Sequence, residues 1–138
     1  MNVVPLFDAR KLEFKRACDR HFAYHQTSPE PDNRRFFEEC CRLQAEFERT
    51  EAALLATPAL SLADAAYKIE LSLGYIDDVC CSATEDMAKL KRALVALQSG
   101  SAATAIKLLN DALNGEAEYE FCYEGAAAAL ADLRRLSA

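Results

Sequence analysis

The chain has 138 residues, with 22 acidic and 16 basic side chains, a net charge of −6 and an isoelectric point near 4.9. The 51% hydrophobic and 28% charged content is typical of a globular protein and excludes a disordered chain, and the length predicts a single domain over residues 1–138. Direct nucleic-acid binding and a membrane span are both excluded, because the basic residues lie in mixed patches and no apolar run is long enough.

Ala and Leu are abundant, whereas Val, Ile and Thr are few, and the chain has only four Gly and four Pro residues. This composition favours helix over sheet. We therefore predict an all-α protein, a single-domain bundle of five or six helices. The N-terminus lacks the basic and apolar regions of a signal peptide. It follows that the protein is expected in the cytoplasm, with its six cysteines as reduced thiols.

The first helix is expected over residues 6–26, ending in the proline-containing stretch "TSPEPDN". A second helix is expected from Asp32 or Asn33 to about Ala56. Its apolar residues recur at steps of four and three and then after one heptad, which places them on one face. They are Phe36, Cys40, Leu43, Phe47 and Leu54.

After the break "TPALS", where Ser61 can cap a helix, an apolar stripe keeps its phase from Leu62 to Leu97. This stripe predicts a long central helical segment over 62–98 around which the bundle assembles. Ser82 and Glu85 form a capping-box pattern that would divide the segment into two nearly collinear helices. The unbroken phase of the apolar stripe favours one continuous helix. Both alternatives, one helix or two, stay open. A short helix capped by Ser101 and closed by Gly115, then a final helix over 116–136, complete the prediction.

Cys18, His21 and His25 lie at helical spacing in the segment "RACDRHFAYHQ", and these are the only two histidines. With Cys40, or a thiol from the Cys80–Cys81 pair, they have the residue types of a Cys/His site for a transition metal. No C-x-x-C or H-E-x-x-H motif accompanies them. The alternative is that they are polar and thiol groups at the edge of a core, with no cofactor.

The chain contains no P-loop, no G-x-S-x-G and no nameable oxyanion hole, so a non-enzymatic role is predicted. A second apolar stripe on the 62–98 segment indicates either a central helix or a contact surface. Tyrosine is enriched in such surfaces. The residues predicted for contact with a protein partner or a second copy are Tyr67, Leu71 and Tyr75, together with Tyr119 and Tyr123.

The segments "LLATPALSLADAAYKIELSL" and "AAAALADLRRL" resemble a loose group of small uncharacterised bacterial helical proteins, often prophage-associated. The pattern is a TPA-x-[ST] break, an Ala-rich helix with a Lys, and a terminal D-x-x-R-L helix. The chain departs from it in its two Cys-Cys pairs and in Asp64, where Gly is common. The resemblance implies a helical fold and no reaction. The matching residues here are Thr57, Pro58, Ala59, Ser61, Lys68, Asp132 and Leu136.

Overall fold

A computed structural model describes residues 5–27, 34–79, 84–114 and 120–137. These residues form six α-helices and one 3-10 helix, with no strand among them, so the all-α prediction is confirmed. Within the same ranges, every helix is too short or too polar to cross a lipid bilayer. The elements are α1 (Leu6–Thr27), α2 (Arg34–Ala56), α3 (Leu62–Val79), α4 (Thr84–Gln98), α5 (Ala102–Leu113), η1 (Glu120–Tyr123) and α6 (Glu124–Leu136).

The chain divides into two compact units, residues 1–57 and residues 58–138. The first unit contains α1 and α2, and the second contains α3 to α6. Each unit is described by itself below. The expectation of one domain over residues 1–138 stays a prediction.

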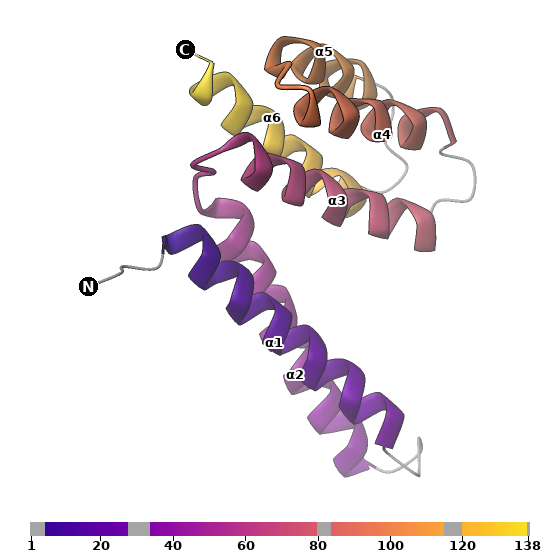
Figure 1. Cartoon of the computed structure of the whole chain (residues 1–138). Coiled ribbons are helices and arrows are strands. Elements are labelled where there is room, and N and C mark those ends of the chain that lie inside the picture. Colours follow the sequence, from indigo (N-terminus) through magenta and orange to yellow (C-terminus); the bar gives the residue numbers. More distant parts are fainter. Residues whose placement is uncertain (1–4, 28–33, 80–83, 115–119, 138) are drawn as a thin grey trace. The chain divides into compact units, whose positions relative to one another are not determined.

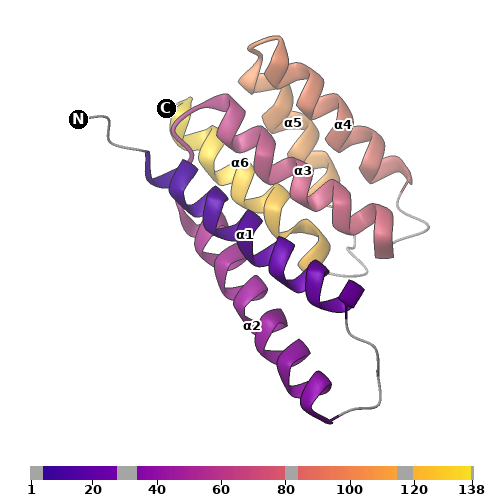
Figure 2. The ribbon, with the colours of Figure 1, turned by 60° about the horizontal axis from the view of Figure 1, so that its bottom comes forward.

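The first unit is a helical hairpin in which α1 and α2 run antiparallel, side by side (Figures 1 and 2). Phe14 of α1 and Phe47 of α2 pack with ring centroids 5.3 Å apart. Leu43 is buried on the same face of α2 as Phe47, as its spacing predicts. On one flank of the hairpin, Arg20 of α1 forms an ion pair with Glu46 of α2.

The second unit is built from four helices, and α3 packs against both α4 and α6, while α5 packs against α4 and α6. The chain reverses between α3 and α4, so the 62–98 segment is two helices side by side (Figure 1). The prediction of one continuous helix is therefore wrong, and so is the alternative of two nearly collinear helices. The turn between the two helices lies outside the described residues, and with it Ser82 of the predicted capping box.

The apolar stripe itself faces the core, although the helix carrying it is divided. Ile69, Ile76 and Leu90 are fully buried, and Leu73 and Leu94 pack against them. A heptad pattern specifies which face is apolar, and it holds equally for one helix or for two that pack on each other. Periodicity therefore located the core correctly without deciding where the chain turns.

The described helix ends agree with their predicted caps in part. The Ser61 Oγ accepts a hydrogen bond from the Asp64 N–H at 3.3 Å, which confirms the cap of α3. Ser101 stands at the N-cap of α5, but its hydroxyl bonds the Thr104 hydroxyl and no backbone N–H. Gly100 ends α4 with a φ of +79°, which only glycine adopts at no steric cost. Gly115 lies outside the described residues.

A buried ion pair joins α3 to α6. The Lys68 Nζ donates to the Asp132 Oδ2 at 2.5 Å, and the side chains are 1% and 9% exposed. The other carboxylate oxygen of Asp132 accepts a hydrogen bond from the Ala59 N–H at 3.2 Å. Arg135 donates to the Ala59 carbonyl oxygen. The N–H and the carbonyl oxygen of Ala59 thus both bond to side chains of α6, and these bonds attach the "TPALS" break to that helix.

One turn further along, the same two helices meet at a glycine. The Ser72 hydroxyl of α3 accepts a 2.7 Å hydrogen bond from the Ala126 N–H in the first turn of α6. That N–H has no acceptor within its own helix, so Ser72 supplies the cap that the N-cap residue Tyr123 does not. A Cβ on Gly125 would overlap the Lys68 carbonyl oxygen and lie 2.9 Å from the Ser72 Oγ. Close packing of α3 on α6 therefore requires glycine here.

We expect Gly125→Ala to lower the free energy of unfolding by about 1–3 kcal/mol, because backbone atoms cannot move aside as a flexible side chain can. The matched control is Gly74→Ala in α3, where a Cβ meets nothing within 4 Å. This variant should be about 0.5–1 kcal/mol more stable, since alanine favours a helix interior. Urea titrations followed by circular dichroism measure both, and equal effects would contradict the close contact.

Candidate functional site

A shallow opening of about 300 Å³ lies on one flank of the α1–α2 hairpin, and we call it the thiol–imidazole opening. Two residues of α1 and five of α2 line it, all within the first unit. It therefore brings together, from the two helices, three of the four residues predicted for a metal site. The lining residues are His21, His25, Cys40, Cys41, Gln44, Ala45 and Glu48.

The two imidazoles occupy successive turns of α1. Their ring centroids are 4.6 Å apart in an edge-to-face arrangement. His21 is half-buried, with its ring 6.0 Å from that of Phe47, whereas His25 is exposed. One ring is therefore supported by the hairpin core and the other borders solvent. Together they place ring nitrogens, which are donors or acceptors according to tautomer, at the mouth of the opening.

The two thiols differ although they are neighbours in the sequence. Cys40 is half-buried and Cys41 is exposed, because adjacent helical residues point about 100° apart. Desolvation raises the pKa of Cys40, and the neighbouring Cys41 and Glu39 raise it further. Cys40 is thus a protonated thiol at neutral pH, and Cys41 is the more accessible of the pair.

Cys18 belongs to a different place on the hairpin. It does not line the thiol–imidazole opening, although it is one turn from His21 on α1. Its partial burial raises its pKa to about 11, with additional contributions from the negative charges of Glu51 and Asp19. A thiol held protonated in this way is a weak nucleophile. We therefore separate Cys18 from the predicted His21, His25 and Cys40 set.

No three His, Cys, Asp or Glu side chains within the described ranges are already grouped as metal ligands. Cys80, the alternative thiol, lies outside those ranges. The imidazoles are instead in contact with each other, and Cys40 approaches them from the opposite helix. Three residues predicted for a metal site, His21, His25 and Cys40, therefore share one opening without forming a preformed ligand cage.

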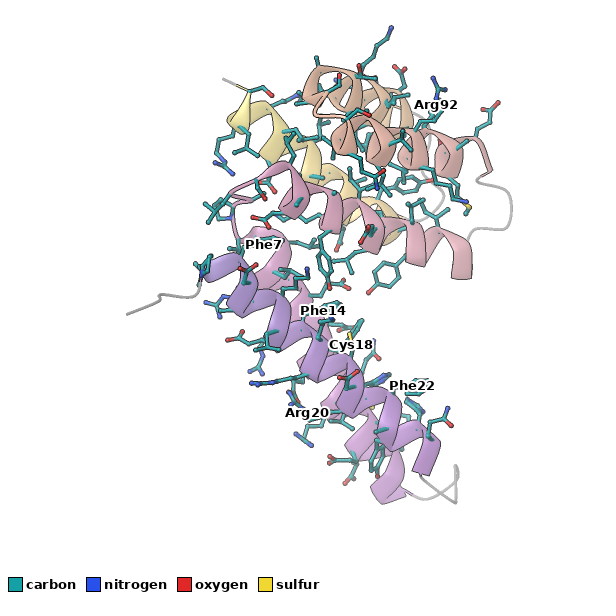
Figure 3. All side chains as sticks on the ribbon, viewed as in Figure 1. Phe7, Phe14, Cys18, Arg20, Phe22 and Arg92 are labelled. Carbon is teal, nitrogen blue, oxygen red and sulfur yellow. The ribbon has the colours of Figure 1, made fainter. Side chains whose placement is uncertain are left out.

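Two phenylalanines of the hairpin are exposed to solvent. Phe22 of α1 and Phe37 of α2 are each 66% exposed. Figure 3 shows Cys18 and Phe22 on one side of α1 and Arg20 on the other. On α2, Phe37 lies one turn before Cys41, which lines the opening. The hairpin therefore presents large apolar side chains to solvent, a feature that marks interaction surfaces when several occur together.

Sequence reasoning missed this surface. Neither Phe22 nor Phe37 is among the residues predicted for contact. The signal was available, because the spacing that puts Phe36 on the core-facing stripe turns Phe37 about 100° away from it. Gln44, Ala45 and Glu48 of the opening were also missed, because nothing in their residue types distinguishes them from an ordinary helix flank.

The residues predicted for partner contact are placed differently. Tyr67, Leu71 and Tyr75 are all half-buried on α3, and Tyr75 packs against the core of the second unit. Tyr123 is only 6% exposed, and its hydroxyl donates to the Asp86 Oδ2 at 2.7 Å. Tyr123 is thus a core residue that attaches η1 to α4, a correction of its predicted contact role. Tyr119 lies outside the described residues.

The chain matches no protein-family model, and no curated protein or solved structure shows significant similarity to it.

We expect Cys18 to be alkylated far more slowly than Cys41. A pKa raised to about 11 from 9.0 lowers the thiolate fraction at pH 8 roughly 100-fold, and the thiolate is the reacting form. Timed iodoacetamide labelling with peptide mass spectrometry measures both rates in one sample. Glu51→Gln removes one negative charge beside Cys18 and should accelerate its labelling while leaving Cys41 unchanged. Equal rates at the two cysteines would contradict the described environments.

Proposed function

We propose that the protein acts without catalysis, by protein–protein contact in the cytoplasm, and that the exposed aromatic surface of the α1–α2 hairpin makes this contact. The observation that carries the proposal is the pair of phenylalanines, Phe22 and Phe37, each two-thirds exposed on adjoining helices. Covering one such ring stabilises a complex by about 1.5–3 kcal/mol. Exposed aromatic rings are suitable anchors for an interface.

A second copy of the chain is the occupant that we propose. Two antiparallel helices are half of a four-helix bundle, and symmetric dimers are the commonest oligomers. The charges support this pairing, since α1 carries five basic and three acidic residues, whereas α2 carries four basic and five acidic residues. In a two-fold arrangement, α1 of one copy packs beside α2 of the other, and opposite net charges then meet.

An adaptor or inhibitor role toward a different protein is the second candidate. Its support is the half-buried stripe of Tyr67, Leu71 and Tyr75 on α3, which combines apolar area with two hydroxyl tips. This stripe belongs to the second unit, so its contribution can be separated from that of the hairpin by mutation.

We expect the native chain to be a dimer, and Phe22→Ser with Phe37→Ser to convert it to a monomer. Light scattering coupled to size-exclusion chromatography measures the mass over a range of concentrations. Both side chains are exposed, so the helical circular dichroism signal should be unchanged. The matched control is Val95→Ser on α4, which is 61% exposed and should leave the mass unchanged.

Three outcomes would contradict the proposal. A native chain that stays monomeric at all concentrations excludes self-association. A doubly substituted chain that stays dimeric shows that the hairpin surface is not the interface. If Tyr67→Ala with Tyr75→Ala dissociates the dimer instead, with circular dichroism unchanged, the α3 stripe replaces the hairpin as the contact surface.

A further inference from the structure

We propose that the thiol–imidazole opening binds one borderline transition-metal ion of the Zn²⁺ class, through His21, His25 and Cys40. Its three ligands all come from one hairpin, so a single copy of the chain holds the complete ligand set. Imidazole and thiolate are the donors that such ions prefer over oxygen. The chain has only two histidines, and both of their imidazoles line this opening.

The two histidines supply a chelate of favourable spacing. Residues four apart on a helix lie on one face, and a pair of histidines at this spacing binds zinc in helical metalloenzymes. Here the rings already touch edge to face with centroids 4.6 Å apart. Both rings line the opening, and coordination requires that a nitrogen of each ring turn toward the same ion. Side-chain rotations at exposed positions such as His25 occur within nanoseconds.

Cys40 is the third donor because it enters the opening from the opposite helix and is half-buried there. Cys41 lines the same opening but is exposed, and the turn of about 100° between neighbours prevents both thiols from meeting one ion. Cys18 is excluded because it does not line the opening. When the sulfur coordinates the ion, the Cys40 S–H bond breaks and its proton passes to water. A water molecule or the nearby Glu48 carboxylate completes four-coordination.

Titration of the reduced, metal-free protein with Co²⁺ and then Zn²⁺ tests the site. We expect one equivalent of Co²⁺ to produce visible bands of a tetrahedral complex and a near-ultraviolet sulfur-to-cobalt band, and Zn²⁺ to bleach both. His25→Ala and Cys40→Ser should each weaken binding more than roughly 100-fold, since even the loss of an outer-shell partner costs 10–100-fold. Cys40→Ser should also remove the sulfur band.

Cys41→Ser is the matched control, because it removes the neighbouring thiol and should leave stoichiometry, affinity and spectrum unchanged. Cys18→Ser should behave in the same way. Circular dichroism of each variant verifies that the hairpin is folded, and both substituted cysteines are partly or fully exposed in the hairpin.

The proposal is overturned if the native protein binds no Co²⁺ at micromolar protein concentration. It is also overturned if binding survives His25→Ala, or if Cys41→Ser removes the sulfur band and Cys40→Ser does not. Dimer mass is measured with chelator present, so a failure of the metal site and a failure of the proposed dimer give different results.

Discussion

The packing of α3 on α6 depends on two charges that have been taken out of water. Lys68 is 1% exposed, and its ammonium group lies 2.5 Å from the Asp132 carboxylate. An isolated buried charge costs several kcal/mol, and the ion pair offsets much of this cost for both groups. Asp132 also accepts from the Ala59 N–H, which extends the constraint to the chain break before α3. These contacts determine which turn of α6 faces which turn of α3.

Once that register is set, the neighbouring contacts along α3 and α6 fit together. Gly125 meets the backbone of α3 beside Lys68, where no larger residue fits, and Ser72 caps the first turn of α6. Two residues before Gly125, Tyr123 donates a hydrogen bond to Asp86 of α4. The polar contacts are few, but each joins two elements far apart in the sequence. Apolar burial supplies most of the stability, and the buried polar groups specify the arrangement.

The hairpin formed by α1 and α2 differs in kind from the four-helix unit. Two helices cannot enclose a core of their own to the same extent, and this hairpin leaves Phe22 and Phe37 exposed. Its histidines and the Cys40–Cys41 pair lie on one flank of the same hairpin. The hairpin thus combines exposed aromatic rings with imidazole and thiol groups, whereas the four-helix unit contains the main described core cluster.

The sequence predicted the all-α class, most helix bounds and the core-facing stripe, because these depend on local periodicity. Leu73 and Leu94 were placed correctly even though the helix between them was not continuous. The turn between α3 and α4 was missed because a heptad phase can continue across a reversal. The Lys68–Asp132 pair was also missed, since its residues are 64 positions apart and nothing local couples them.

The resemblance to small bacterial helical proteins stays a prediction, yet its pattern has a physical basis in this fold. Ala59, Lys68 and Asp132 belong to that pattern, and the three residues form one hydrogen-bonded network. In this fold, the motif residues of the break, the Ala-rich helix and the terminal helix thus hold these segments together, and the motif indicates no reaction. For the candidate site, helical spacing predicted that His21 and His25 lie close together on one helix and that Cys40 lies on the next helix. The exposure of Phe37 could not be predicted in this way, because it depends on which face of α2 packs against α1.

The most direct test of the α3–α6 constraint is a double-mutant cycle on the buried pair. Urea unfolding of Lys68→Met, Asp132→Leu and the combined variant gives three changes in the free energy of unfolding. Each single substitution should cost about 3–5 kcal/mol, because it removes one partner of a buried ion pair. The combined variant should recover most of that loss. Single variants within about 1 kcal/mol of the native chain, or losses that simply add, would contradict the account.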